Sequence, residues 1–448
     1  MLARWKRIPG LGGFVLSLFL LAAVRFAGPG WAQEGPDIFT TIDIPSSFNP
    51  VGSGARALGM GGAFIAVADD ATAASWNPGG LIQLDRPEIS AVGTFLYRVE
   101  EINFGTNPEA DGRESVTEAN LNYLSLAYPF RLFGYNMIVS LNYQQLFDFY
   151  REWNFPLRED SDEFRIDFDQ SGHLYALGVA YSIRILPQIS FGLTLNFWED
   201  FLYDNQWRAT TKTSDSFTIA NTRAIDEIKR KEEFSFSGFN LNLGLLWNAT
   251  GKLTVGAVFK SPFTADLDLR LTQSRIRTVQ GESPQESSFT ITEDQELDMP
   301  MSYGLGIAYR LSDQFTLSAD VTRTHWNDFI LQDEAGRKTS PISGLPDNES
   351  DIDPTIQVRT GAEYLLIRPK FVIPVRAGFF YDPAPAERDP DDFFGFSLGT
   401  GIGIDRFVFD VAYQYRFGRD VGAFIDPARK FSQDVDEHKV FSSLIIHF

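Results

Sequence analysis

The chain of 448 residues contains no cysteine, and histidine is scarce. Without cysteine, neither a disulfide framework nor a thiolate metal site can form. The four histidines are scattered, and no H-E-x-x-H motif or pair at metal-ligand spacing occurs, so we predict no metal site. We therefore expect that the protein is not an enzyme and has no cofactor.

Positive charge is also in short supply. The 39 basic residues face 59 acidic ones, which gives a net charge of -20 and argues against nucleic acid as a partner, because phosphate binding needs a basic face. After residue 33, no stretch approaches the ~20 apolar residues that a membrane-spanning helix needs. Any membrane-embedded part beyond that point must then be a β-barrel, since only helices and closed barrels satisfy their backbone groups in lipid.

The N-terminal segment has the features of an export signal. Three basic residues within the first seven positions precede an apolar run, Leu11–Val24, and small residues then lead to Ala32. This order predicts a signal peptide over residues 1–32, cleaved near Ala32 and Gln33. An anchor helix is the alternative, but the run is short for a span and Arg25 ends it.

Most of the remaining chain alternates between apolar and polar residues. In Phe407–Phe417, the odd positions are all apolar or aromatic, while the even ones include Asp410 and Arg416. An apolar face towards lipid and a polar face towards a lumen is typical of a transmembrane β-barrel, whereas a soluble sandwich has its polar face outside. Near Gly238 the apolar residues change phase, which predicts a β-bulge. The inward glycines of Gly395–Gly403 indicate room for a plug or ligand, or a close backbone approach.

The connections between these segments alternate in length. Six short and seven long ones predict a barrel of fourteen antiparallel strands over residues 87–448. The final strand ends with Ile446 and Phe448 in one phase, which resembles the signal read by the barrel-assembly machinery. The long connections are placed at Glu101–Asn120, Tyr150–Gln170, Asp204–Glu233, Thr272–Pro300, Asn327–Pro354, Asp382–Asp392 and Gly418–Glu437.

Residues 33–86 do not alternate and are predicted to form a separate domain before the barrel. Their Gly- and Ala-rich run lacks the Lys-Ser/Thr of a phosphate loop. Asp69 and Asp70 could be an acid/base pair, but adjacent residues rarely converge on one substrate. We favour a turn or helix start, with Asp70 capping Ala71–Ala74.

Several motifs resemble the outer-membrane long-chain fatty-acid transporters of the FadL/OmpP1 type. The hatch of that family carries the run seen at Gly54–Phe64, followed here by Ala68–Ala71 and Trp76–Pro78. Further similarity lies in Pro300–Arg310, Thr316–Asp320 and Val375–Asp382, so the resemblance covers essentially the mature chain. Where the family has Asn-Pro-Ala, this sequence reads Asn77-Pro78-Gly79.

The resemblance implies a fourteen-stranded barrel in the outer membrane, closed by an N-terminal hatch inside the lumen. It implies capture of a fatty acid or hydrocarbon, passage by the hatch, and lateral release into outer-membrane lipids through a kink in the third strand. That strand is expected near Asn136–Phe149, where no Gly or Pro explains a kink. The hatch residues that it implies for gating are Arg56, Asp69, Asp70, Asn77, Pro78 and Gly79.

Two other functions remain open at this point. Related barrels with a similar hatch serve as secretion accessories that bind exported proteins. A general porin is the second alternative, although an ordered hatch would obstruct free diffusion.

Overall fold

The structure is a computed structural model that describes residues 50, 52–159, 162–199, 205–219 and 222–448. The predicted signal peptide lies outside these residues and stays a prediction. All described residues belong to the unit that begins at Thr41. Within the described ranges, no helix has the length and apolar character needed to cross a membrane.

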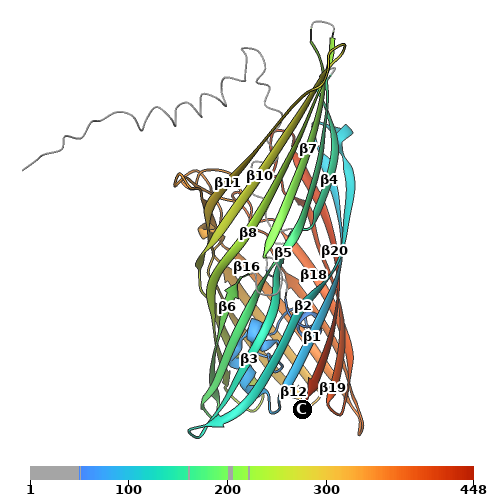
Figure 1. The fold of residues 1–448 in the computed structure, drawn as a ribbon. Helices are drawn as coiled ribbons and strands as arrows, with labels where there is room; N and C mark the ends of the chain where they lie inside the picture. Colours follow the sequence, from blue (N-terminus) through green and yellow to red (C-terminus); the bar gives the residue numbers. More distant parts are fainter. Residues whose placement is uncertain (1–49, 51, 160–161, 200–204, 220–221) are drawn as a thin grey trace, which may run out of the picture. The chain divides into compact units, whose positions relative to one another are not determined.

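A closed barrel of 14 antiparallel strands forms the wall (Figure 1), as the sequence predicted. The last strand pairs with the first over its whole length, which closes the ring. In order around the ring lie β1 (Glu88–Phe104), β2 (Gly112–Leu132), β3 (Tyr135–Asp148), β5 (Asp162–Leu186), β6 (Ile189–Trp198), β8 (Thr222–Asn248), β9 (Leu253–Lys260), β12 (Ser302–Ser312), β13 (Phe315–Thr324), β16 (Thr355–Ile367), β17 (Val372–Tyr381), β18 (Phe393–Ile404), β19 (Phe407–Val421) and β20 (Phe431–His447).

Further strands continue the wall beyond the end opposite the short turns, and they form the tall sheet at the top of Figure 1. They lie in line with β3, β6, β9 and β12 respectively. β7 pairs with both neighbours of β6, β10 pairs with β8 and β11, and β4 pairs with β5. These are β4 (Arg151–Glu159), β7 (Gln206–Ile219), β10 (Phe263–Val279) and β11 (Gln285–Met299). The loops hold β14 (Ile330–Gln332), β15 (Lys338–Thr339) and the 3-10 turns η2 (Pro108–Ala110) and η3 (Trp326–Asp328).

The tall sheet occupies segments that the sequence predicted to be long loops. Consecutive strands are joined by the six short turns that the sequence predicts near Leu132–Tyr135, Leu186–Gln188, Asn248–Gly251, Ser312–Gln314, Ile367–Lys370 and Asp405–Arg406. Most of the predicted long loops, however, are strand. Tyr150–Gln170 and Thr272–Pro300, for example, are largely the hairpins β4–β5 and β10–β11. Beyond the membrane both faces of a sheet meet water, so the apolar alternation fades while the backbone pairing continues. Only Asn327–Pro354 and Asp382–Asp392 are mainly irregular.

The outer face of the wall is apolar where the strands cross the ring. On β18, Phe396 and Leu398 are 43% and 57% exposed, whereas Ser397 between them is 1% exposed. On β19, Phe407 and Phe409 are exposed and Asp410 is buried. The predicted alternation is confirmed on these strands, with the apolar side chains outward as a lipid-facing belt requires.

The predicted bulge at Gly238 is wrong. β8 runs without interruption, and its even-numbered side chains stay inward along its length: Phe234 and Phe236 are buried, and so are Asn240 and Asn242. The apolar residues of β8 move from the outward positions to the inward ones because the lining of the lumen changes along the strand. The lumen is polar beside Asn242 and aromatic beside Phe236.

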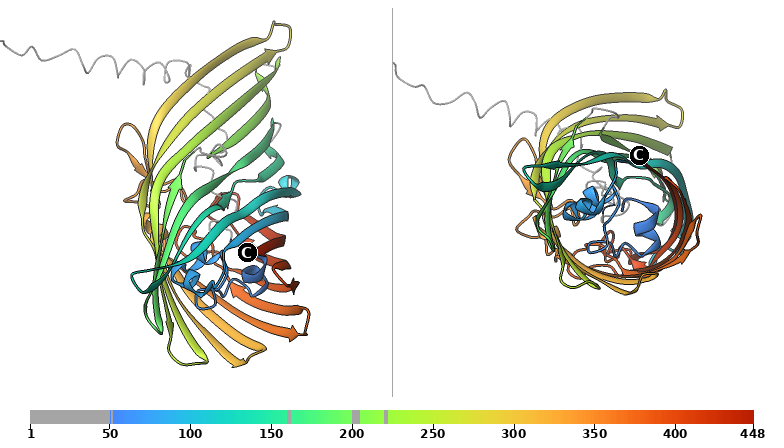
Figure 2. Two further views of the ribbon diagram at one scale, coloured as in Figure 1. Left: turned by 60° about the horizontal axis from the view of Figure 1, so that its bottom comes forward. Right: turned by 90° about the horizontal axis from the view of Figure 1, so that it is seen from below.

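The segment before β1 lies inside the barrel, as the view from below in Figure 2 shows. It contains α2 (Ala55–Gly59), α3 (Ala73–Trp76) and η1 (Pro78–Gln83). Most of its side chains are buried, and they share one apolar core with inward residues of the wall such as Tyr123 and Phe441. We call residues 52–86 the hatch.

Candidate ligand pathway and hatch

The Asn77-Pro78-Gly79 turn joins the hatch to the wall. Asn77 is fully buried, and its Nδ2 donates to the carbonyl oxygens of Ile65, at 2.8 Å, and Leu245 of β8, at 3.0 Å. Its Oδ1 accepts from the Gly79 amide at 3.0 Å. One side chain therefore fixes the turn, the neighbouring hatch segment and a wall strand.

Glycines of the wall make room for this turn. A Cβ on Gly244 would lie 2.2 Å from Asn77 Oδ1, and one on Gly192 would lie 2.2 Å from the carbonyl carbon of Pro78. At Gly79, the departure from the family motif, a Cβ would lie 2.9 Å from the Gly244 oxygen. Gly79 therefore lets the hatch approach the wall closely.

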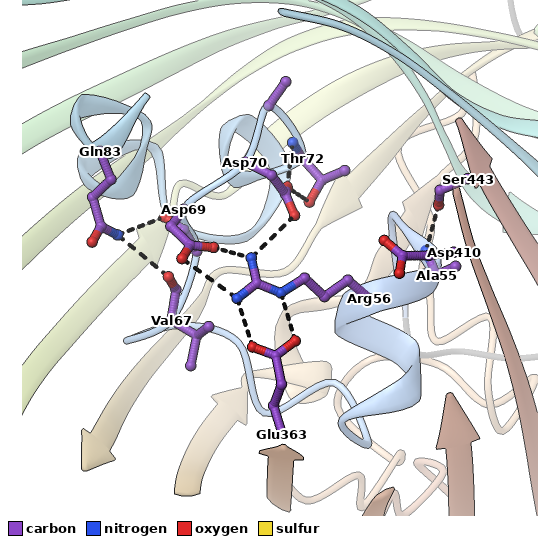
Figure 3. Close-up of polar contacts among 12 residues, drawn as sticks. Ala55, Arg56, Val67, Asp69, Asp70, Thr72, Gln83, Glu363, Asp410 and Ser443 are labelled. Atoms are coloured by element: carbon purple, nitrogen blue, oxygen red, sulfur yellow. Dashed lines mark hydrogen bonds and ion pairs between the residues drawn. The ribbon is translucent and has the colours of Figure 1, made fainter. Parts of the chain in front are cut away.

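Arg56 is the electrostatic centre of the hatch (Figure 3). Its Nη1 pairs with Asp69, and its Nη2 and Nε donate to the Glu363 carboxylate of β16 at 2.9 and 3.1 Å. Burial alone would lower the pKa of Arg56, but the carboxylates of Asp69 and Glu363 raise it well above its ordinary value. Arg56 thus holds a hatch loop and the wall together as a permanent cation.

Asp70 forms hydrogen bonds within the hatch turn that follows it. Its Oδ1 accepts from the amide of Thr72 at 2.9 Å and from the Thr72 hydroxyl at 2.5 Å, and burial raises its pKa. The helix begins at Ala73, two residues later than predicted. Asp70 Oδ2 also lies 4.0 Å from Arg56 Nη1, so Asp69 and Asp70 face the same guanidinium group, and Asp70 shapes the turn as well.

Wall side chains also bind the hatch backbone. Asp320 Oδ2 accepts from the amides of Phe64, at 2.6 Å, and Ile65, at 2.8 Å, while Glu88 accepts from Ala71 at 2.8 Å. Ser397 accepts from the Gly61 amide at 2.8 Å. A hatch with little regular structure has its buried amides satisfied in this way.

Ser397 also has a sequence context that needs an explanation. Gly395–Gly399 reads G-x-S-x-G, the pattern of a hydrolase nucleophile, which requires a sharp strand-to-helix turn. Here the run lies within the continuous strand β18, and the Ser397 hydroxyl contacts the Gly59 carbonyl at 3.1 Å. The serine anchors the hatch. Beside it, a Cβ on Gly399 would lie only 3.0 Å from Gly59 Cα, so a glycine there allows the close approach.

Beyond the hatch, towards the tall sheet, the lumen is lined by aromatic side chains. Trp207 is stacked between Phe149 and Phe234, with ring centroids 4.5 and 4.6 Å away, and all three rings are buried. Trp198 and Phe236 extend the cluster. The sequence did not predict this lining, although the change of phase near Gly238 was its signal.

A cavity of about 110 Å³ lies between the hatch and the wall, and Leu146, which packs against the aromatic cluster, is one of its lining residues. Its apolar walls include Trp76 of the hatch and Phe380. Its charged lining residues are Lys260, Arg359, Arg416 and Lys439 together with Asp320, Asp382 and Glu437. Arg359 pairs with Asp382 at 2.8 Å. Among the residues that the structure describes, no acidic side chain forms an ion pair with Lys260.

The third wall strand is interrupted although neither β3 nor the break itself contains Gly or Pro. β3 ends at Asp148 and β4 begins at Arg151. Pairing between β2 and β3 stops at Tyr123 and Gln144, and within the described chain β4 pairs with β5 alone. The upper part of β2 and the third strand beyond Gln144 therefore face each other without ladder hydrogen bonds. We call this gap in the pairing the seam.

The end of the chain closes the ring. Ile446 pairs with Ile89 of β1 and Phe407 of β19, and the Phe448 amide donates to the Pro87 carbonyl at 2.9 Å. Phe448 itself is 61% exposed. Recognition of these residues during barrel assembly stays a prediction.

Comparison with known proteins shows which family has this architecture. The sequence profile described as "Outer membrane protein transport protein (OMPP1/FadL/TodX)" matches residues 48–436. The chain belongs to this family. It is therefore an outer-membrane β-barrel of a family that transports hydrophobic compounds and is not a family of enzymes.

Solved structures of the family have the same fold. A FadL homologue of Pseudomonas aeruginosa is 14% identical, with a TM-score of 0.57 over 91% of this chain and 100% of that one. The Pseudomonas putida toluene transporter TodX is 13% identical, with a TM-score of 0.57 and the same coverage. The monoaromatic hydrocarbon channel CymD is 17% identical, with a TM-score of 0.52 over 89% of this chain and 98% of that one. No curated protein matches the sequence.

Proposed function

We propose that this protein carries long-chain fatty acids and similar hydrophobic molecules across the outer membrane without altering them. The aromatic lining of the lumen is the observation that carries the proposal. A general water-filled pore would be lined by polar groups. Buried rings such as Phe149, Trp207 and Phe236 instead offer an apolar ligand a favourable environment.

Release is lateral in this proposal. The hatch is bound to the wall on several sides by Arg56, Asn77 and their partners, so a path straight through it would break many buried contacts. The seam beside β2 offers another route. The seam begins beside Gln144, where Leu121 and Leu124 of β2 are exposed on the outer face, and an apolar molecule that leaves at this end passes into hydrocarbon without crossing water.

Lys260 favours an amphiphile with an anionic head, because no acidic side chain among the described residues forms an ion pair with it, whereas Arg359 already pairs with Asp382. Lys260 and Arg359 both line the cavity, and their charges lie close enough to interact. A carboxylate between them would relieve this repulsion and accept charge-assisted hydrogen bonds. The apolar tail would then extend along the aromatic lining.

Binding of a fluorescent long-chain fatty acid to the purified protein tests this assignment. We expect Lys260→Met to weaken binding about tenfold, because a hydrogen bond to a charged group contributes ~1.5–3 kcal/mol. Binding of an alkane of equal length should not change. Lys252→Met, at a turn outside the cavity, is the matched control.

Two outcomes would contradict the proposal. If the wild-type protein binds neither ligand, hydrophobic transport is wrong for this chain. Stable co-purification of an exported protein with a ligand-free barrel would instead favour the secretion-accessory function.

A further inference from the structure

We infer that Lys252 and Arg310 form a binding site for a phosphate group at the end of the barrel that carries the short turns. In outer-membrane barrels this end faces the periplasm. The site lies apart from the aromatic lining and takes a ligand of different chemistry. The inference therefore goes beyond the proposed function and does not depend on it.

A cavity of about 310 Å³ lies between the hatch and two of the short turns. Val67, Asp69 and Gln83 line it on the hatch side (Figure 3). Residues of the β8–β9 and β12–β13 turns line it on the wall side, among them Lys252 and Arg310. Both of these cations are also exposed, so a solute can reach them from the periplasm.

Lys252 and Arg310 lie directly opposite each other on neighbouring segments of the wall. The Arg310 amide donates to the Lys252 carbonyl oxygen at 2.8 Å, one step beyond the end of the β9–β12 ladder. Even-numbered residues of these strands face inward, as the buried Gly256 and Ala308 show. The two side chains thus leave the wall on the same face, where like charges at opposite positions are destabilising.

No carboxylate of the protein compensates this pair of charges. Wherever the chain is described, no acidic side chain forms an ion pair with Lys252 or Arg310. Asp69 and Glu363 also line the cavity, but both pair with Arg56. The cavity therefore keeps an excess of positive charge.

Inward cations deeper in the lumen do have partners. Arg376 Nε lies 2.6 Å from the Glu363 carboxylate, and Lys439 Nζ lies 2.9 Å from Glu437. Such pairs fix the interior of the barrel without any outside group. The unpaired cations of the cavity instead favour an anion that comes from outside the chain.

Neutral donors beside the cations indicate which anion fits. Thr316 lies opposite Arg310 on β13 and lines the cavity. Thr250 Oγ1 accepts from the amides of Lys252, at 3.1 Å, and Leu253, at 2.9 Å, which leaves its hydroxyl proton available to a ligand. Two hydroxyls, an ammonium group and a guanidinium fork outnumber the oxygens of a carboxylate and match those of a phosphate group.

Calorimetric titration of inorganic phosphate into the full chain in dodecyl maltoside, with chloride as the balancing salt, tests the site. We expect Lys252→Gln and Arg310→Gln each to weaken binding about tenfold, because each removes a charge-assisted hydrogen bond. Thr316→Val keeps the charge and should weaken it about threefold. Arg131→Gln is the matched control, since it removes the same charge from an exposed position beside the β2–β3 turn, outside the cavity.

Three results would overturn the inference: no binding to the wild type, equal affinities in all variants, or equal weakening by Arg131→Gln. Thermal unfolding without phosphate, which we expect to be unchanged in every variant, shows that the changes in affinity do not come from misfolding.

The phosphate group can belong to a free ion or to a phospholipid headgroup, and a second titration with water-soluble dihexanoyl phosphatidylglycerol separates these sources. Binding tighter than that of inorganic phosphate, and weakened by Arg310→Gln, would assign the site to a headgroup. Binding of inorganic phosphate alone would assign it to the free ion.

Discussion

At the scale of single residues, the hatch is fixed by a few polar side chains and by glycines that allow close contact. Arg56 and Glu363 form an ion pair across 307 positions of sequence, and no local pattern could predict it. Asn77 was predicted as a gating residue from the resemblance, but its two carbonyl partners were not. The sequence indicates such residues by type, whereas their partners depend on how the barrel curves around them.

The contact between Gly244 and Asn77 gives a stability prediction. We expect Gly244→Ala to lower the free energy of unfolding by ~1–3 kcal/mol, because its Cβ would meet Asn77 Oδ1 at 2.2 Å and displace the turn. Thermal unfolding in detergent measures the change. Gly251→Ala is the control, since its Cβ would meet nothing within 4 Å. Equal transition temperatures for the two variants would show that the hatch does not rest on this contact.

At the scale of elements, strand positions followed from the sequence wherever lipid lies on one side. The turns beside the membrane and the strands β18 and β19 were predicted well because alternation is strong there. The tall sheet was not, since water on both sides removes the pattern that marks a strand. The aromatic lumen was misread for a related reason: alternation reports which face is apolar, and at Phe236 that face is the inside.

Asp391 joins the Asp382–Asp392 loop to the connection between β19 and β20, which gives a pH prediction. Its Oδ2 accepts from the Gly422 amide at 2.8 Å, and burial raises its pKa to about 6. The folded pKa of Asp391 is above the unfolded pKa of ~4, so the protonated carboxyl stabilises the folded loops. This contribution is fully present below pH ~4 and is lost as the pH rises through about 6.

Hydrogen exchange of these loops between pH 4 and 7 measures the effect. We expect protection near Gly422 to fall with rising pH in the wild type relative to Asp391→Asn, in which the group cannot ionise. Comparison at each pH removes the intrinsic pH dependence of exchange. A constant difference between the two proteins would contradict the assignment.

At the scale of the whole barrel, the interior has two parts with different physical character. The lower part is filled by the hatch and by polar and charged partners such as Asp320 and Glu363. The upper part is aromatic and leads to the seam between β2 and the third strand. In the proposed route, a hydrophobic molecule enters from the tall sheet, is stabilised until it reaches the hatch, and leaves sideways through the unpaired wall.

Stapling the seam tests this route most directly. Thr117→Cys and Asn154→Cys would be joined by a short reducible dithiol linker, and transfer of a fluorescent long-chain fatty acid into vesicle lipid would be followed. The control staple joins Leu126→Cys and Leu141→Cys, which are exposed partners in the paired part of the same strands. The account predicts that the seam staple stops transfer while binding persists, that reduction restores transfer, and that the control staple has no effect. Undiminished transfer through a stapled seam would contradict it.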